Sequence, residues 1–260
     1  SVSSRCHFPG FCPRIGVRGR LRRNDAPAVA FCFLSYPPAC VIFITASVQD
    51  MKYYIYMEMP KEKDVVEVAT CRAGEGGCPM AVIDPKVVAE RLQALLDDPQ
   101  YRPRLDELLK KEFNFHSQFC AVITGCPNAC ARPQIHDFGV IGRARIGLNE
   151  DVCTGCGMCE EACKEGALIL VEGVPQIDKE KCIGCCDCIR ACQADALSIA
   201  GKIYEVVVGG KLGRHPRLAQ SEGEFVSVDE VVERLRRMIE LLLSEGRKGE
   251  RLGALLERLK

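Results

Sequence analysis

Apolar side chains recur at the 3.6-residue period of an α-helix in three stretches of the chain. The first predicts a helix over about 85–97, with Pro85 in its first turn and an Asp-Pro pair stopping it. The second predicts a short helix over about 102–112, and the third makes 228–260 helical, with Gly246 ending one helix before a short last one. The apolar positions are Val87, Val88, Leu92, Leu95, Leu96, Leu105, Leu108, Leu109, Val231, Val232, Leu235, Met238, Ile239, Leu242 and Leu243.

Two shorter apolar runs, 119–123 and 138–142, are of the β type. The first leads into residues 124–133, a stretch rich in Cys, Gly and Pro. Gly and Pro interrupt regular elements, so we expect this stretch to be a loop.

The cysteine content changes this picture of an ordinary mixed domain. The chain has 260 residues and 18 cysteines, a share of about 7% that lies below the roughly 8–10% of short secreted disulfide scaffolds. A chain this long can bury a core without disulfides. Its formal net charge of zero argues against a generally basic nucleic-acid-binding protein. Charged residues at 27% and hydrophobic residues at 47% are typical of a soluble globular protein of one or two domains.

Eight of the cysteines form two C-x2-C-x2-C-x3-C motifs within residues 149–201. Three thiolates at this spacing bind one [4Fe-4S] cluster, and the fourth cysteine of each motif binds the other cluster. Zinc usually takes two C-x2-C pairs without a third cysteine in step, and disulfides need an oxidising compartment. We therefore expect one cluster on Cys153, Cys156, Cys159 and Cys192, and a second on Cys182, Cys185, Cys188 and Cys163.

Four more cysteines form a C-x6-C pair and a C-x3-C pair: Cys71, Cys78, Cys126 and Cys130. Gly and Pro punctuate both pairs, so each lies on a loop whose backbone N–H groups can face sulfur. One [4Fe-4S] cluster bound by all four is the simplest interpretation. Zinc fits the ligand count equally well, and the spacing favours the cluster.

Residues 124–133, Thr-Gly-Cys-Pro-Asn-Ala-Cys-Ala-Arg-Pro, followed by Ile-His-Asp-Phe-Gly-Val-Ile-Gly at 135–142, resemble the second half of sirohaem sulfite and nitrite reductases. Residues 206–218 and 249–256 are similar to a strand with its loop and to the closing helix of that family. Residues 149–201 resemble bacterial two-cluster ferredoxins. Such an insertion is known from the C subunit of anaerobic sulfite reductase, from dissimilatory enzymes and from small proteins similar to them.

This resemblance covers about 51–260 and implies an α+β fold. Residues 51–148 and 202–260 would form a sirohaem-reductase-type half domain, a mixed sheet with helices, and 149–201 an inserted two-[4Fe-4S] ferredoxin-like module. The sequence departs from the pattern in places. Lys164 and Gln193 stand where Pro usually follows the fourth cysteine, and Cys186 stands where Gly is usual. The first cysteine pair has six intervening residues instead of five, and the family's first half is not found.

The resemblance also implies roles for single residues. The second cysteine of the C-x3-C pair bridges the cluster to the sirohaem iron in this family, and here that is Cys130. Sirohaem is rich in carboxylates, which Arg side chains match bidentately, although each basic residue could instead be a solvated surface charge. The cofactor-binding residues implied are Arg72, Asn128, Cys130, Arg132, Arg143, Arg145, Lys211, Arg214 and Arg217; the catalytic ones are Cys130, Arg132, Lys211 and Arg214.

Residues 1–50 are unusual, with six Arg against two Asp and an apolar run over about 26–46 that Pro37-Pro38 interrupts. The interruption argues against a signal peptide and against a membrane helix, so we expect a cytoplasmic protein. Composition changes at Met51, our hypothetical natural start, which makes 1–50 an unassigned extension that need not be natural. Four cysteines there have no assigned role: Cys6, Cys12, Cys32 and Cys40.

The resemblance implies an enzyme with three [4Fe-4S] clusters and sirohaem. It would pass electrons from the ferredoxin-type clusters to the sirohaem-coupled cluster and reduce sulfite or nitrite. The expected partners are that oxyanion, a low-potential electron donor protein, and a second copy or partner subunit, with no nucleic acid and no membrane. Two alternatives stay open: an electron-transfer or sirohaem-binding protein without sulfite reductase activity, and a polyferredoxin with an isolated third cluster.

Overall fold

The computed structural model describes residues 64–109 and 118–260. The expectations for residues 1–50 and for Met51 lie outside the described residues, and so does the end of the helix predicted over 102–112. Within the described residues, no helix combines the length and the apolar character needed to cross a membrane.

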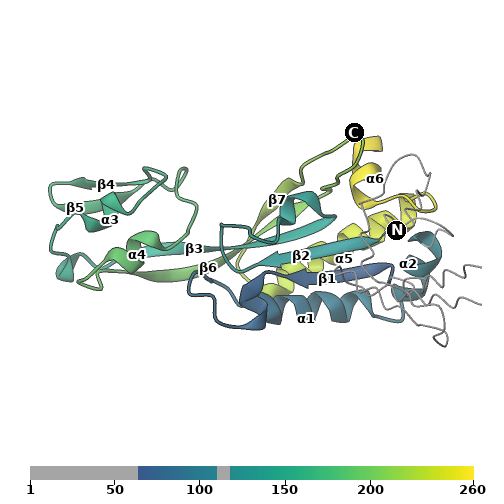
Figure 1. Ribbon diagram of the computed structural model, residues 1–260, viewed down its shortest axis with the longest axis horizontal. Helices are drawn as coiled ribbons and strands as arrows, with labels where there is room; N and C mark the ends of the chain where they lie inside the picture. The colour runs from purple at the N-terminus through teal and green to yellow at the C-terminus, as the bar shows by residue number, and fades with distance from the viewer. Residues whose placement is uncertain (1–63, 110–117) are drawn as a thin grey trace, which may run out of the picture. The chain divides into compact units, whose positions relative to one another are not determined.

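The described residues form both strands and helices (Figure 1). The strands are β1 (Val66–Thr70), β2 (Phe119–Thr124), β3 (Phe138–Leu148), β4 (Leu168–Val171), β5 (Val174–Ile177), β6 (Leu197–Val208) and β7 (Gln220–Phe225). The helices are α1 (Pro85–Leu96), α2 (Arg102–Leu109), α3 (Met158–Glu161), α4 (Asp187–Ala191), α5 (Val228–Glu245) and α6 (Leu252–Arg258).

Five strands form one mixed sheet in the order β1-β2-β3-β6-β7. β1, β2 and β3 are parallel, whereas β6 is antiparallel to both β3 and β7. Helix α1 contacts β1 and β2, α5 contacts β6 and β7, and the two helices contact each other. The expected α+β fold with a mixed sheet and helices is confirmed.

The hydrophobic core lies between the sheet and these helices. Alternate residues of the strands, such as Phe138 and Val140 of β3, are fully buried against Leu92 of α1 and Leu235 of α5. This is the alternation expected of a strand that packs one face against helices.

The predicted helices are confirmed as far as the structure describes them. Asp84 accepts a hydrogen bond from the Lys86 N–H at the start of α1, and a capping box of Ser227 and Glu230 starts α5. One detail is wrong: Val87 was placed with the apolar residues of its helix, yet it is 49% exposed because it lies beside, and not within, the stripe that faces the sheet.

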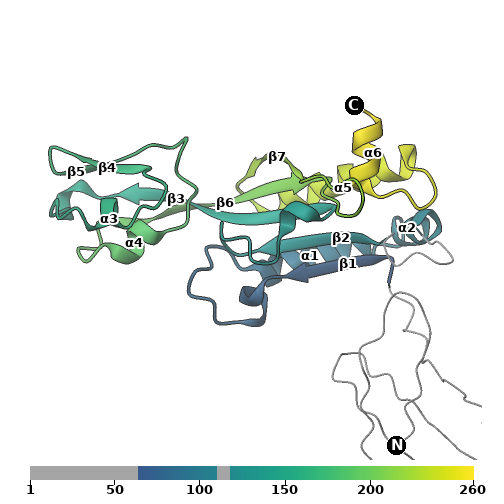
Figure 2. The ribbon, with the colours of Figure 1, turned by 45° about the horizontal axis from the view of Figure 1, so that its top comes forward.

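Strand β3 is longer than predicted, and its added length carries an insertion. It pairs with β6 over eleven residue pairs, from Phe138 opposite Val208 to Leu148 opposite Leu197, with one irregularity after Arg145. Between the far ends of these two strands lie α3, the β4–β5 hairpin and α4 (Figures 1 and 2). A small hydrophobic cluster of its own, centred on Leu168 and Leu197, holds this insertion to the ladder.

A buried ion pair joins the last helix to the sheet. Asp137, immediately before β3, is fully buried, and its carboxylate accepts hydrogen bonds from Nε and Nη2 of Arg251 at 3.2 and 2.7 Å. Its Oδ2 also accepts the Cys120 N–H at 3.1 Å. Since Arg251 caps α6 and Cys120 belongs to β2, one carboxylate links three elements.

We predict that Asp137→Asn lowers the free energy of unfolding by about 3–5 kcal/mol, because it leaves the Arg251 charge without its buried partner. Anaerobic urea unfolding followed by circular dichroism measures this. Asp229→Asn is the control: its partner Arg91 and Asp229 itself are largely exposed, so its effect should stay below about 1 kcal/mol. Equal losses in the two variants would contradict the structural role of Asp137.

Candidate functional site

Two of the predicted ligands follow directly after parallel strands. Cys71 comes after β1, and Cys126 comes two residues after the end of β2. Thr70 and Ile123 are register partners, and the Cys71 N–H donates to the Ile123 carbonyl at 3.0 Å. Both loops therefore leave the sheet at the same edge.

Gly125 organises the loops at this edge. Its N–H donates to the Cys71 Sγ at 3.4 Å, and its carbonyl accepts from the N–H groups of Val82 and Ile83 at 2.7 and 3.1 Å. A Cβ at residue 125 would lie 3.1 Å from the Ala81 Cβ and 3.2 Å from the Ile83 carbonyl oxygen. The absence of a side chain thus lets the segment that follows Cys78 approach the segment that contains Cys126.

The four cysteines of the C-x6-C and C-x3-C pairs come together around Cys126. Burial raises the pKa of Cys126; the Asn128 N–H opposes this by hydrogen bonding, whereas the negative charges of Cys130, Cys78 and Cys71 raise it further. Cys126 is 7% exposed, whereas Cys130 is exposed. The group therefore has a buried side and a side open to solvent, with Cys130 on the open side.

Backbone strain accompanies this group. Ala129 and Arg132, on either side of Cys130, have φ angles of 49° and 56°, in the left-handed region that non-glycine residues rarely occupy. The Arg132 N–H donates to the Ala129 carbonyl at 2.7 Å, which closes the turn. Strain of this kind tends to cluster at functional sites.

The seven predicted basic residues fall into two sets. Arg143 is paired with Glu205 at 2.5 Å and Glu224 at 3.6 Å. Lys211 is paired with Glu257, and Arg217 donates to the Gly253 carbonyl at 3.1 Å. The other four are exposed and make no ion pair with another described residue: Arg72, Arg132, Arg145 and Arg214. The structure thus leaves four guanidinium groups available for an anionic ligand.

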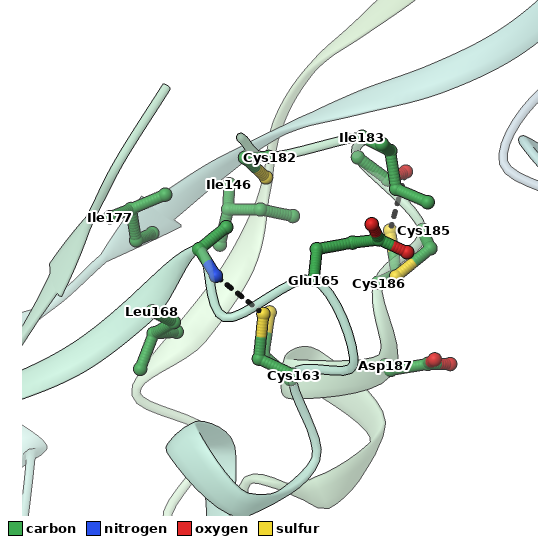
Figure 3. Close-up of a pocket in the computed structure, with 13 residues that line it drawn as sticks. Ile146, Cys163, Glu165, Leu168, Ile177, Cys182, Ile183, Cys185, Cys186 and Asp187 are labelled. Atoms are coloured by element: carbon green, nitrogen blue, oxygen red, sulfur yellow. Dashed lines mark hydrogen bonds between the residues drawn. The ribbon is translucent and has the colours of Figure 1, made fainter. Parts of the chain in front are cut away.

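The insertion contains two cavities lined by cysteines. The first measures about 330 Å³, including the space at its mouth, and Cys153, Cys156, Cys159 and Cys192 line it. The second measures about 370 Å³, and Cys163, Cys182, Cys185, Cys186 and Cys188 line it (Figure 3). The structure thus gathers each predicted set of four ligands around a separate cavity, and it adds Cys186 to the second.

The pKa of the exposed Cys156 shifts in the opposite direction from the pKa values of the more buried thiols, Cys159 of the same cavity included. Hydrogen bonds from the Met158 N–H and the Thr154 hydroxyl hold the pKa of the exposed Cys156 below its usual value. In the second cavity, burial raises the pKa of Cys185, and it raises that of Cys188 to about 12. Without a bound metal, Cys156 is therefore a more reactive nucleophile than Cys185 or Cys188.

Strand β3 contacts both the loop of the second cavity and the loop of the Cys126 group. A Cβ at Gly142 would lie 2.6 Å from the Gly125 carbonyl oxygen. Two residues further on, the Ala144 N–H donates to the Gly184 carbonyl at 3.0 Å, and a Cβ at Gly184 would lie 2.5 Å from the Ala144 carbonyl oxygen. The loops that carry Cys126 and Cys185 thus contact the same short stretch of β3.

No group of three or more His, Cys, Asp or Glu side chains in the described ranges lies close enough to hold one metal ion. A [4Fe-4S] cluster differs, because each thiolate binds a different iron atom and the sulfur atoms stand apart. Sets of four thiols on loops with backbone N–H donors are typical of iron–sulfur proteins.

A match to a protein-family model agrees with the class of iron–sulfur proteins. The model described as nitrite and sulphite reductase 4Fe-4S domain matches residues 62–259, and the chain belongs to this family. The chain is 34% identical over 200 residues to the coenzyme F420-dependent sulfite reductase of Methanocaldococcus jannaschii, a match that covers 76% of this chain and 30% of that protein. It is 47% identical over 47 residues to the C subunit of the anaerobic sulfite reductase of Salmonella typhimurium, covering 18% and 14% of the two chains.

Among solved structures, that of dissimilatory sulfite reductase I is similar, with a TM-score of 0.52 at 24% identity. The match covers 74% of this chain and 49% of the other, and it supports the fold. The chain spans less than a third of the length of the first curated relative.

The sequence did not reveal the glycine contacts at β3 or the pairing of Arg143, because both depend on residues far apart in the chain. A departure from the motif did single out Cys186, but only the cavity shows what surrounds it. The metal and cofactor roles of the predicted residues stay predictions.

We predict that iodoacetamide alkylates Cys156 before Cys188 in the metal-free protein. The thiolate is the nucleophile, so Cys156 should already react at a pH where Cys188, with its pKa of about 12, is still a protonated thiol. Peptide mass spectrometry after short pulses between pH 6 and pH 9 measures the order. Equal labelling of the two residues across this range would contradict the prediction.

Proposed function

We propose that this protein is an iron–sulfur oxidoreductase that passes electrons from two [4Fe-4S] clusters in the insertion to a sirohaem-coupled [4Fe-4S] cluster, for reduction of sulfite or nitrite. The observation that carries the proposal is that the loops of Cys126 and Cys185 contact β3 two residues apart, at Gly142 and Ala144. Family membership supports sulfite or nitrite reduction in general terms.

The donor sets fit the proposed clusters. Each of the three groups offers at least four thiols, and soft thiolates are typical ligands of iron–sulfur clusters. Backbone N–H groups point at sulfur in the groups, as in the hydrogen bonds to Cys71 at 3.4 Å and to Cys163 at 3.3 Å. Such hydrogen bonds help to set the reduction potential of a cluster, so the loops would influence the potential as well as supply ligands.

From these contacts we also infer an order of electron transfer. The cluster of Cys163, Cys182, Cys185 and Cys188 is the near one, because its Gly184 contacts β3 at Ala144. Ala144 is two residues from Gly142, which is about 7 Å along a strand, and Gly142 contacts the Cys126 loop. The cluster of Cys153, Cys156, Cys159 and Cys192 is then the far one, which takes up electrons first.

The exposed Cys130 and the four basic residues without an ion pair suit a carboxylate-rich macrocycle. Cys130 is exposed, as a bridge to a haem iron requires, and Arg72, Arg132, Arg145 and Arg214 make no ion pair with described residues. Guanidinium groups would hold haem carboxylates by paired, charge-assisted hydrogen bonds. When bound, sirohaem would supply the iron that coordinates the anion.

The same arginines would act on the substrate. Arg132, next to the strained Cys130 turn, and Arg214 would draw a small oxyanion to the open side of the group and stabilise its charge. In this role they bind and orient the anion, while the cofactor supplies the chemistry of bond cleavage.

One observation favours the alternative, a sirohaem-binding or electron-transfer protein without sulfite reductase activity. Glu205 and Glu257 already neutralise Arg143 and Lys211 in the structure, so fewer unpaired cations remain for an anion. A partner subunit or a second copy would then have to supply the missing positive charge.

The electron donor would be a low-potential protein with a basic docking surface. Residues 149–201 contain ten acidic against four basic side chains. Unlike charges steer diffusional encounter between redox partners. A cytoplasmic location, where thiols stay reduced, belongs to the same proposal.

The absorption spectrum of the anaerobically reconstituted full chain tests the function. We expect the Soret and α bands of sirohaem, iron and sulfide for three clusters, and turnover of sulfite or nitrite with reduced methyl viologen. Haem without turnover of either anion would establish the alternative. A protein with clusters but no haem bands would refute the sirohaem-coupled site.

Cys130→Ser sharpens this test, because it removes the proposed bridge at an exposed position. The magnetic coupling between haem and cluster should be lost from the EPR or Mössbauer spectrum, while the two clusters of the insertion stay unchanged. Cys120→Ser is the matched control, since Cys120 is a half-buried thiol of β2 outside the proposed ligand sets. Coupling that survives in Cys130→Ser excludes the bridge.

The order of the clusters makes a separate prediction. Cys182→Ala disturbs the near cluster and Cys153→Ala the far one. Relaxation enhancement of the EPR signal of the Cys126 group by its nearest neighbour should disappear in Cys182→Ala and persist in Cys153→Ala. Far-ultraviolet circular dichroism verifies that both variants fold. The opposite pattern would reverse the proposed order.

A further inference from the structure

The two cysteine loops of the insertion have left-handed residues at the same two positions, and one of these positions is glycine in the first loop and cysteine in the second. Residues 153–159 read Cys-Thr-Gly-Cys-Gly-Met-Cys, and residues 182–188 read Cys-Ile-Gly-Cys-Cys-Asp-Cys. Gly157 has φ 79°, and Cys186, at the corresponding position, has φ 64°. A left-handed residue other than glycine costs about 1–2 kcal/mol, so the second loop holds a thiol where glycine is the unstrained choice.

The Cys186 thiol lies in the second cavity together with the four proposed ligands (Figure 3). Its side chain is 5% exposed, and its sulfur is 3.9 Å from the Gly184 carbonyl oxygen, to which the S–H donates. Cys185 and Cys182 are close enough for their charges to act on it. The cavity therefore offers five thiols, whereas the first cavity offers four.

We propose that Cys186 is a reserve ligand of the cluster held by Cys163, Cys182, Cys185 and Cys188, and that it replaces Cys185 when this neighbour is lost. The inference rests on the proposed function, because it requires a cluster in this cavity. Cys185 is the residue replaced, because one peptide bond joins the two and both side chains line the same cavity.

The exchange conserves atoms and electrons. The bond between iron and the Cys185 sulfur breaks, and a bond between the same iron and the Cys186 sulfur forms. The proton of the Cys186 thiol passes to the departing Cys185 thiolate, and no iron changes its oxidation state. The competing explanation is that Cys186 only fills space, since it also packs in the main hydrophobic core.

Iron content and EPR spectra of the anaerobically reconstituted full chain test the proposal in Cys185→Ala and in Cys185→Ala/Cys186→Ala. The single variant should keep the iron of the wild type with a shifted EPR signal, and the double variant should lose the iron of one cluster. Cys156→Ala is the matched control: with Gly157 beside it, the first loop has no reserve thiol and should lose iron. Equal iron loss in Cys185→Ala and the double variant would overturn the proposal.

A variant that adds a reserve thiol to the first loop tests the proposal independently, in case Cys185→Ala folds poorly. Space around Gly157 is open, because no atom lies within 4 Å of a Cβ built there. Cys156→Ala/Gly157→Cys should therefore regain the iron that Cys156→Ala loses, and failure to regain it counts against the proposal. If the wild type binds all three clusters but Cys185→Ala loses iron and Cys156→Ala/Gly157→Cys does not regain it, only the proposal of a reserve ligand is refuted. Wild-type protein without clusters in the insertion refutes the proposed function as well.

Discussion

The pairing of β3 with β6 is the constraint on which the rest of the structure depends. One end of this ladder belongs to the mixed sheet and its core, and the other end carries the insertion. A slip of one residue would turn every side chain to the opposite face. Phe138 would leave the core, and Gly142 would leave its contact with Gly125. Register therefore fixes both the core and the separation of the cysteine groups.

Close backbone contacts accompany this separation. At Gly142 and Gly184 an added Cβ would meet backbone atoms 2.5–2.6 Å away, and backbone cannot move aside as a flexible side chain can. Strained backbone lies nearby, at Ala129, Arg132 and Cys186. Strain persists only where the surroundings impose it, and here the surroundings are packed loops around cysteines. The structure thus combines regular strands, which set distances, with strained turns, which direct thiols.

Local signals in the sequence predicted much of this fold. Pro85 and the apolar stripe after it marked α1, and the spacing of the cysteines marked the groups that the cavities bring together. The full length of β3 was missed, because residues 143–148 alternate polar and apolar side chains instead of continuing the apolar run. The partners of Arg143 were missed for another reason: Glu205 and Glu224 lie on β6 and β7, more than sixty residues away.

Such pairing matters because the overall charge offers an oxyanion little attraction. The insertion holds six more acidic than basic residues, whereas residues 51–148 and 202–260 together hold only two more basic than acidic ones. Charges farther away than about 8 Å are largely screened at physiological ionic strength. In the proposed function, attraction of an anion would therefore have to come from individual guanidinium groups. The ion pair of Arg143 with Glu205 occupies one of the candidate groups. Arg132 and Arg214 have no such partner among the described residues, so in the proposal they would supply the positive charge that binds the anion.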